Sequence, residues 1–202
     1  MICPKCGMAY VPGIPDNDKQ HRKHCDLICN GPRIRTIPAG AETWHSGSEE
    51  ILLVTNASPR SLRTLAHDAS LCANQEVHYD GGIYHHYDPP DDRDIHIFLC
   101  RRGSRIVALL IFERRTHVWR CLWSEASTPD CTEVADRRAM WSIVFVWVHM
   151  KHRRSGLAIA LFLAAKTRMR LGDDDIGWYT PFSSGGEALV RHLYPTAFYV
   201  AK

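Results

Sequence analysis

The basic, glycine-containing turn at residues 151–156 constrains the fold of this chain more than any other segment. An apolar, β-branched run at 143–148 leads into it, and an apolar segment with helical spacing leaves it at Leu157. A strand that enters a helix through a short turn presents unpaired backbone N–H groups and the positive end of the helix dipole. Such a site binds a pyrophosphate without further groups. The sequence therefore predicts a strand, a pyrophosphate-binding turn and a helix in direct succession.

Strand and helix patterns also alternate along the rest of the chain. Ser58 and Pro59 supply an N-cap and a proline at the first position of a helix. Strand patterns occupy 50–55, 95–100, 105–112, 118–123, 143–148, 176–179 and 197–200, and further helices are expected at about 155–169 and 186–193. Residues 79–94, rich in Tyr, His, Asp, Gly and Pro, should form a long irregular loop. This order predicts an α+β fold with a mixed, mostly antiparallel sheet flanked by helices.

The turn and the order of elements resemble the GNAT acetyltransferases. The spacing R-x-x-G-x-A at 153–158 is similar to the pattern with which that family holds the pyrophosphate of acetyl-CoA. The resemblance implies the GNAT fold, with acetyl-CoA as the donor. The residues implied to bind it end the strand and form the turn: Trp147, Val148, Arg153, Arg154, Ser155, Gly156, Leu157 and Ala158.

Two of these assignments have a structural alternative. Backbone N–H groups of Trp147 and Val148 would hold the pantetheine and polarise the thioester carbonyl. The alternative for Trp147 is a buried core aromatic. The alternative for the turn is a solvated basic loop before a helix, which the placement of Gly156 disfavours.

Composition limits the class of protein. A chain of 202 residues, 45% hydrophobic and 23% charged, can form one globular domain with a small appendage. A net charge of +3 is too small to indicate nucleic-acid binding. We expect no membrane span and no signal peptide, because no apolar run is long enough. We therefore expect the eight cysteines to stand in a reducing cytosol, where clustered cysteines more often bind metal than form disulfides.

Cysteine and histidine residues cluster near the N-terminus in a zinc-binding pattern. Cys3 and Cys6 form a C-x2-C pair, and His21, His24 and Cys25 follow. Because residues four apart share one face of a helix, His21 and Cys25 form the better second pair, with His24 as the alternative fourth ligand. Four protein ligands leave no open position on the metal. The sequence thus predicts structural zinc at Cys3, Cys6, His21 and Cys25.

The module around this site should depend on its metal for folding. It is too small to bury a core of its own. The alternative is that Cys3 and Cys6 are exposed reduced thiols. Cys29 lies outside the spacing and should be unliganded. We expect a zinc finger at 1–30, a linker at 31–48 and the acetyltransferase domain at 49–202.

The N-terminal module resembles the finger of the Eco/ESCO-type sister-chromatid cohesion acetyltransferases. That finger carries C-x2-C-G-M-x-Y and a His fifteen positions after the second Cys, as residues 3–10 and His21 do here. The family has His where this chain has Cys25, and zinc accepts either residue. We expect a cytoplasmic enzyme, or a nuclear one if the chain is a eukaryotic cohesion-type enzyme as the resemblance implies.

The resemblance continues into the acetyltransferase domain and then breaks at one loop. Residues 105–110 look like the family's strand before its catalytic half, and 147–158 look like its W-V…R-R-x-x-I-A segment. The family's distal loop, F-S-D-P-T-x-x-G, aligns with 178–185, where Tyr179 replaces the Ser and Thr180 replaces the Asp. Threonine cannot serve as a carboxylate base. The acceptor, or the way in which it loses its proton, is therefore expected to differ.

Acetyl transfer to an amine needs an acid for the leaving thiolate and a route for the amine proton. Tyr194 ends a segment that resembles the A-x-x-L-Y of many GNAT proteins, whose Tyr protonates the CoA sulfur, and it could instead be an ordinary packed tyrosine. A carboxylate or a histidine could act as the base. A histidine at a strand end is also often structural. The candidates for the base or the acceptor loop are Glu113, Glu125, His149, Tyr179 and Thr180.

The chain is therefore expected to be an acetyl-CoA-dependent N-acetyltransferase that acts on a primary amine. The acceptor is either a protein lysine or a cationic small molecule such as a polyamine or an aminosugar. Acidic runs in 88–94 and at 173–175 would attract such a cation if they border the cleft, or they are solvated loops. The alternative is a non-catalytic acetyl-CoA-binding interaction module. A single finger has little affinity for nucleic acid, which disfavours that partner.

Overall fold

The computed structural model describes residues 1–47, 49–77, 84, 94–124, 129–134 and 139–202. Its helices are α1 (Pro15–Asn30), α2 (Arg60–Val77), α3 (Leu157–Met169) and α4 (Ser184–Leu193), with short 3-10 turns η1 (Met150–His152) and η2 (Asp173–Asp175). Its strands are β1 (Glu42–Ser46), β2 (Glu49–Thr55), β3 (Ile95–Arg102), β4 (Arg105–Arg115), β5 (Val118–Leu122), β6 (Asp130–Glu133), β7 (Met140–Val148), β8 (Ile176–Trp178) and β9 (Ala197–Ala201).

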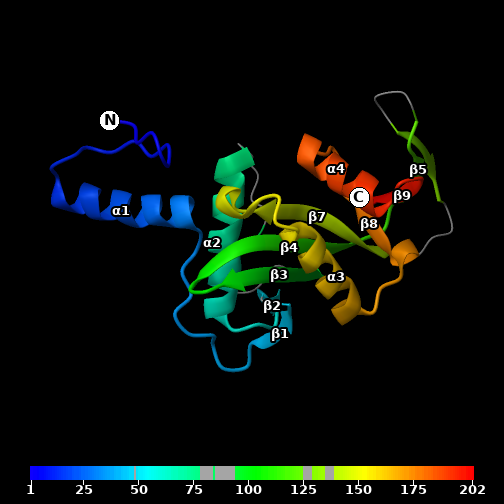
Figure 1. Ribbon diagram of the computed structural model, residues 1–202, viewed down its shortest axis with the longest axis horizontal. Coiled ribbons are helices and arrows are strands. Elements are labelled where there is room, and N and C mark those ends of the chain that lie inside the picture. The colour runs from blue at the N-terminus through cyan, green and yellow to red at the C-terminus, as the bar shows by residue number, and fades with distance from the viewer. Residues whose placement is uncertain (48, 78–83, 85–93, 125–128, 135–138) are drawn as a thin grey trace.

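The described strands form one sheet in the order β1-β2-β3-β4-β7-β8-β9-β5-β6 (Figure 1). The β7–β8 and β8–β9 pairs are parallel, and the remaining neighbours are antiparallel. The β7–β8 register covers only 141–143 against 176–178. The pairing of β4 with β7 shifts register at Ile111/Phe112, so β7 bends where it separates from β8. The chain therefore opens a gap between the last five residues of β7 and the end of β8.

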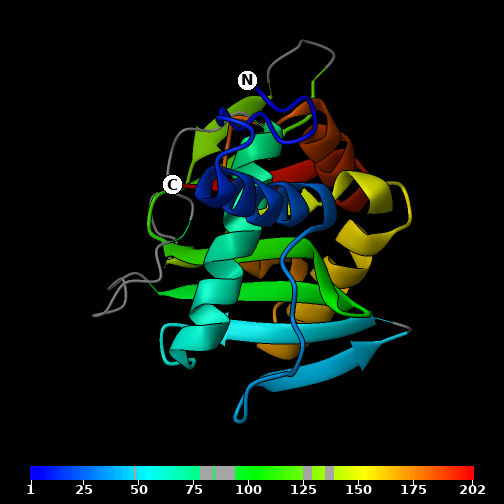
Figure 2. The ribbon, with the colours of Figure 1, turned by 90° about the vertical axis from the view of Figure 1, so that its left-hand side faces the viewer.

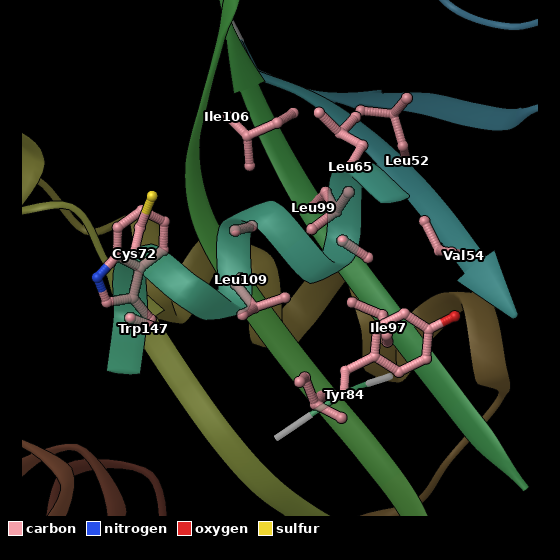
Figure 3. Close-up of a cluster of buried hydrophobic side chains, with 14 of the residues drawn as sticks. Leu52, Val54, Leu65, Cys72, Tyr84, Ile97, Leu99, Ile106, Leu109 and Trp147 are labelled. Carbon is pink, nitrogen blue, oxygen red and sulfur yellow. The ribbon is translucent and has the colours of Figure 1, made fainter. Parts of the chain in front are cut away.

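Alternation along the strands gives the sheet two buried faces. On β3, Ile97 and Leu99 join the cluster under α2, whereas Phe98 and Cys100 join the cluster under α3 and α4. Figure 3 shows the α2 face, where the indole of Trp147 lies beside Cys72 at one end of that helix. Every side chain in these clusters is removed from water, which is the main source of stability for the sheet.

The N-terminal module packs on the domain instead of standing apart from it. Figure 2 shows α1 lying across the end of α2 and the sheet. Cys3, Cys6 and Ile28 belong to the same buried cluster as α2. Gly31 ends α1 at a φ of +76°, and a Cβ there would lie 2.3 Å from the carbonyl oxygen of Ile106. Only glycine allows the chain to pass so close to β4.

Most of the expected elements are confirmed, and three points differ. The helices and the seven expected strands lie within a few residues of their predicted bounds, which confirms the α+β prediction. The expected linker at 31–48 contains β1, which pairs with β2. Strand β6 was not predicted. The long loop expected at 79–94 lies outside the described residues except for Tyr84 and Asp94.

The third difference concerns two cysteines. Cys121 and Cys131 form a disulfide, which departs from the expectation that the cysteines stay reduced. The β5–β6 register places the two residues directly opposite each other, with their Cα atoms 4.0 Å apart. Among the described helices, none is both long and apolar enough to cross a membrane.

Candidate active site

The predicted pyrophosphate turn connects β7 to α3 through η1. Arg154 and Gly156 both have left-handed backbone conformations, with φ of +60° and +79°. Gly156 is the N-cap of α3, and its carbonyl oxygen accepts the N–H of Ala160 at 2.9 Å. The first N–H groups of a helix have no partner within the helix. Those of α3 are therefore directed toward the turn, where an anion would meet them.

The side chain of Arg153 has a structural role in this arrangement. Its Nε donates to the carbonyl oxygen of Val148 at 3.0 Å, and its guanidinium forms an ion pair with Glu76 on α2. Trp147 is buried, and its indole nitrogen donates to the same Glu76 oxygen at 3.0 Å. The exposed Arg154 and the backbone of the turn, including Ser155 and the α3 residues Leu157 and Ala158, are thus the groups placed to meet phosphate oxygens.

Every second residue of β7 directs its backbone N–H and C=O groups toward the gap. The N–H of His149 donates to Val107 on β4 at 2.9 Å. Backbone groups alternate in direction along a strand, so Val148 and Val146 turn theirs away from β4 and toward β8. The bond from Arg153 to the carbonyl oxygen of Val148 agrees with this alternation. The backbone N–H groups of Val148 and Val146 thus face the gap, whereas the N–H of Trp147 faces β4.

Tyr194 lies at the end of α4 on the α3 face of the sheet. Its hydroxyl is buried and, among the described residues, has no hydrogen-bond partner. Its ring meets Phe162 of α3 and Trp178 of β8 edge to face, with centroid distances of 6.4 and 6.3 Å. Burial raises the pKa of Tyr194 well above its ordinary value, and the charges of Asp173 and Asp174 act in the same direction. The phenol is therefore held in its protonated form.

The structure separates the candidate bases. His149 lies on the face of α2: it is buried, packs against Trp147, and its Nδ1 accepts the N–H of Lys151 at 3.3 Å. Burial lowers the pKa of His149. Glu113 is also buried and forms an ion pair with Arg115 at 2.9 Å. Glu125 lies outside the described residues. His149 and Glu113 both lie on the sheet face opposite to Tyr194.

Tyr179 and Thr180 lie at the end of β8, beside the gap. The N–H of Tyr179 donates to Ile143 at 2.9 Å, and the guanidinium of Arg115 stands 5.5 Å from the centre of the Tyr179 ring. Thr180 lines a cavity of ≈ 520 Å³ beside this loop. The other residues that line it are Trp119, Pro129, Cys131, Pro181, Phe182, Glu187, Phe198, Val200 and Lys202.

The acidic residues at 173–175 do not contribute to this cavity. They form η2 at the beginning of β8, the end opposite to Thr180. Lys166 forms an ion pair with Asp173, and Asp175 accepts the N–H of Gly172 at 2.8 Å. The charges of Asp173 and Asp174 act on the site by raising the pKa of Tyr194. The residues 88 and 91–92 of the other acidic run lie outside the described residues.

The predicted zinc ligands meet in one cluster. Ligand atoms of Cys3, Cys6, His21 and Cys25 all lie within 4.8 Å of one another. The Nε2 atom of His21 is buried without a hydrogen-bond partner among the described residues, and its ring stacks on Tyr10 at 3.8 Å. The N–H of Lys5 is the main cause that lowers the pKa of Cys3 to about 6. Three thiols and one imidazole in this arrangement fit tetrahedral zinc.

Comparison with known proteins agrees with both halves of the chain. Residues 1–27 match a family described as the zinc-finger of acetyl-transferase ESCO. An N-acetyltransferase ECO1 of Candida glabrata is 21% identical over 218 aligned residues, which cover 94% of this chain and 82% of that protein. The prediction of a zinc-finger acetyltransferase is thereby confirmed, and the predicted zinc fits the zinc-finger family that residues 1–27 match.

Solved structures agree on the fold. The xEco2 acetyltransferase domain bound to a lysine–CoA conjugate is 16% identical, covers 80% of this chain and 97% of that chain, and has a TM-score of 0.65. Another structure of the xEco2 acetyltransferase domain is also 16% identical, covers 82% and 98% of the two chains, and has a TM-score of 0.62. The expected GNAT fold is thus confirmed.

Proposed function

We propose that this chain, which belongs to the Eco/ESCO-type zinc-finger acetyltransferases, transfers the acetyl group of acetyl-CoA directly to the ε-amine of a lysine in a protein. The lysine is favoured over a small amine because an xEco2 domain of the same fold has been seen with a lysine–CoA conjugate. The cavity beside Thr180 also fits this acceptor. The apolar side chains of its lining suit the four methylenes of a lysine, and Glu187, which also pairs with Arg191, supplies a carboxylate to the lining.

The buried hydroxyl of Tyr194 is the observation that carries the proposal. It has no partner among the described residues, and it lies between α3 and β8, beside the gap in which the thioester would be held. Such an orphaned donor is costly unless a substrate uses it. The phenol stays protonated at neutral pH, so a proton is available for the departing thiolate.

The reaction then proceeds by direct attack. The free amine forms a bond to the thioester carbonyl carbon, and backbone N–H groups of β7 stabilise the oxyanion. The C–S bond breaks, the sulfur takes the proton of Tyr194, and the amine loses a proton as the amide forms. Tyr194 recovers its proton from solvent, so the groups and charges balance.

The acceptor amine loses its proton by a different route from the one that a carboxylate in the distal loop would provide. Thr180 occupies the aligned position and lines the cavity, and its hydroxyl can orient an amine or a water. Glu113 and His149 are buried on the other face of the sheet. We assign the loss of this proton to water held beside Thr180.

Turnover of acetyl-CoA against lysine peptides, polyamines and aminosugars tests the proposal. Lysine peptides should be acetylated and small amines should not. Preferential acetylation of a polyamine or an aminosugar would replace the lysine assignment. Binding of acetyl-CoA without transfer to any amine would indicate the non-catalytic module.

A further inference from the structure

The last turn of α2 contacts both the zinc cluster and the pyrophosphate turn through consecutive residues. The side-chain nitrogen of Gln75 donates to the carbonyl oxygen of Cys6, one of the four clustered cysteine and histidine residues, at 2.9 Å. Glu76 accepts the indole N–H of Trp147 at 3.0 Å and pairs with Arg153. One helical turn thus joins two sites that lie far apart in the sequence.

Glu76 is the central group of this connection. Its side chain is only 6% exposed, and a single carboxylate oxygen receives both donors. Arg153 completes the connection because its Nε also holds the carbonyl oxygen of Val148 at the end of β7. A buried carboxylate between two charge-assisted donors fixes the geometry of everything bonded to it. Glu76 therefore sets the position of the β7 end relative to the turn.

A second set of contacts joins α1 to the same region. Lys151, in η1, donates to the Asn30 side chain at 2.9 Å. Arg105 pairs with Asp26 at 2.8 Å and donates to the carbonyl oxygen of Gly31 at 2.9 Å. These residues lie at the end of the helix that supplies His21 and Cys25 to the cluster. A metal that fixes the beginning and middle of α1 would therefore also steady the turn.

We infer that Gln75 and Glu76 are positioning residues that couple zinc occupancy to acetyl-CoA binding. This inference rests on the proposed acetyl-CoA site and adds a function for the finger. The metal fixes the 3–6 turn and α1, these hold the end of α2, and Glu76 holds Arg153 and the pyrophosphate turn. Loss of zinc loosens the turn and weakens the binding of CoA without touching the reacting atoms.

Binding of CoA to the full chain, measured by calorimetry with and without bound zinc, tests the coupling. Removal of zinc should weaken CoA binding about five- to tenfold, a usual size for coupling between two sites. Hydrogen exchange of the amides in 150–158 should quicken at the same time. Circular dichroism of the metal-free chain checks that the acetyltransferase domain remains folded.

Variants separate the coupling from a general loss of stability. Glu76→Gln removes the ion pair but keeps an acceptor for Trp147, and should raise the KM for acetyl-CoA about fivefold with little change in kcat. Gln75→Ala should reduce the effect of zinc removal on CoA binding. Glu42→Gln breaks the exposed pair with Arg168, and Gln20→Ala changes an exposed α1 residue, so both should behave as wild type. Arg153→Gln combined with Glu76→Gln should add little to either change alone.

The outcomes decide between the two proposals. Equal CoA affinity and equal exchange with and without zinc would overturn the coupling, as would a Glu76→Gln variant that matches Glu42→Gln. Zinc-dependent CoA binding without acetyl transfer to any amine would leave the coupling standing and reject the proposed reaction. Intact acetyl transfer together with CoA binding that does not depend on zinc would reject the coupling and leave the proposed reaction standing.

Discussion

The rings of Trp178 and Tyr194 meet edge to face with their centroids 6.3 Å apart. Phe162 meets the same tyrosine from α3. These contacts bury the phenol among carbon atoms and raise its pKa well above the ordinary value, with Asp173 and Asp174 adding to the effect. The tyrosine reaches this position because it directly follows α4, whose end lies next to Trp178.

Replacing Tyr194 with Phe should lower kcat about a hundredfold, the usual loss when a positioned acid is removed. The KM for acetyl-CoA should change little, because the ring and its packing remain. Steady-state kinetics of the variant measure both quantities. Tyr199→Phe is the matched control, since Tyr199 lies on β9 and packs against the cluster on the other face of the sheet. Equal kcat values for the wild type and Tyr194→Phe would refute the assignment.

The dependence of kcat on pH should show no alkaline loss from Tyr194 near pH 10. A phenol with an ordinary pKa would lose its proton there, and the acid would disappear. Because burial raises the pKa of Tyr194 well above its ordinary value, the acid form persists through the range in which the protein can be assayed. Initial rates between pH 7 and pH 10.5, corrected for spontaneous hydrolysis, give the profile. A decline near pH 10 that is absent in Tyr194→Phe would contradict the raised pKa.

The sequence predicts those parts of the site that depend on local pattern. The turn at 153–158 and the zinc spacing follow from a few neighbouring residues, so both could be read in advance. The partner of Arg153 could not, because Glu76 lies on a distant helix and only the packing of α2 brings it near. The Cys121–Cys131 bond was missed for the same reason, since it depends on the pairing of β5 with the unpredicted β6.

The directions in which side chains and backbone groups point could not be predicted from the sequence either. His149 follows the central strand and looks available as a base, yet the alternation of β7 turns its ring beneath α1 and α2. The same alternation gives Val146 a backbone group in the gap. Side-chain direction depends on register, and the register shift at Ile111/Phe112 has no signature in the sequence.

Zinc content should distinguish Cys25 from its two neighbours. Cys25→Ser removes a ligand of the cluster and should lower the bound zinc well below one ion per chain, with a fall in Tm. Cys29→Ser should keep the metal, because Cys29 lies outside the cluster although its sulfur is 3.8 Å from that of Cys25. His24→Ala should also keep it. Elemental analysis of the purified variants gives the answer, and retention of zinc by Cys25→Ser with its loss from His24→Ala would reverse the ligand assignment.

Gly156→Ala and Gly185→Ala should change stability in opposite directions. Neither new Cβ would meet any atom within 4 Å, so only the backbone conformation decides. Gly156 has a φ of +79°, where alanine costs about 1 kcal/mol or more. Gly185 lies in α4, where alanine gains roughly 0.5–1 kcal/mol. Denaturant unfolding measures both changes. A Gly156→Ala variant as stable as the wild type, with unchanged CoA affinity, would remove the strain argument.

Stability should fall below pH 6.5 in a way that depends partly on His149. Burial lowers the pKa of His149 in the folded chain, and the nearby Lys151 acts in the same direction against the opposing charge of Glu76. The unfolded chain therefore binds a proton first as the pH falls through 6.5, and the folded state loses stability between that value and the lower folded pKa. One such proton contributes at most about 1.4 kcal/mol per pH unit. In His149→Gln, the free energy of unfolding measured at pH 7.5, 6.5 and 5.5 should fall less steeply than in the wild type. His192→Gln, on the exposed surface of α4, should keep the wild-type slope, and an equally steep slope in both variants would show that His149 does not titrate in this range.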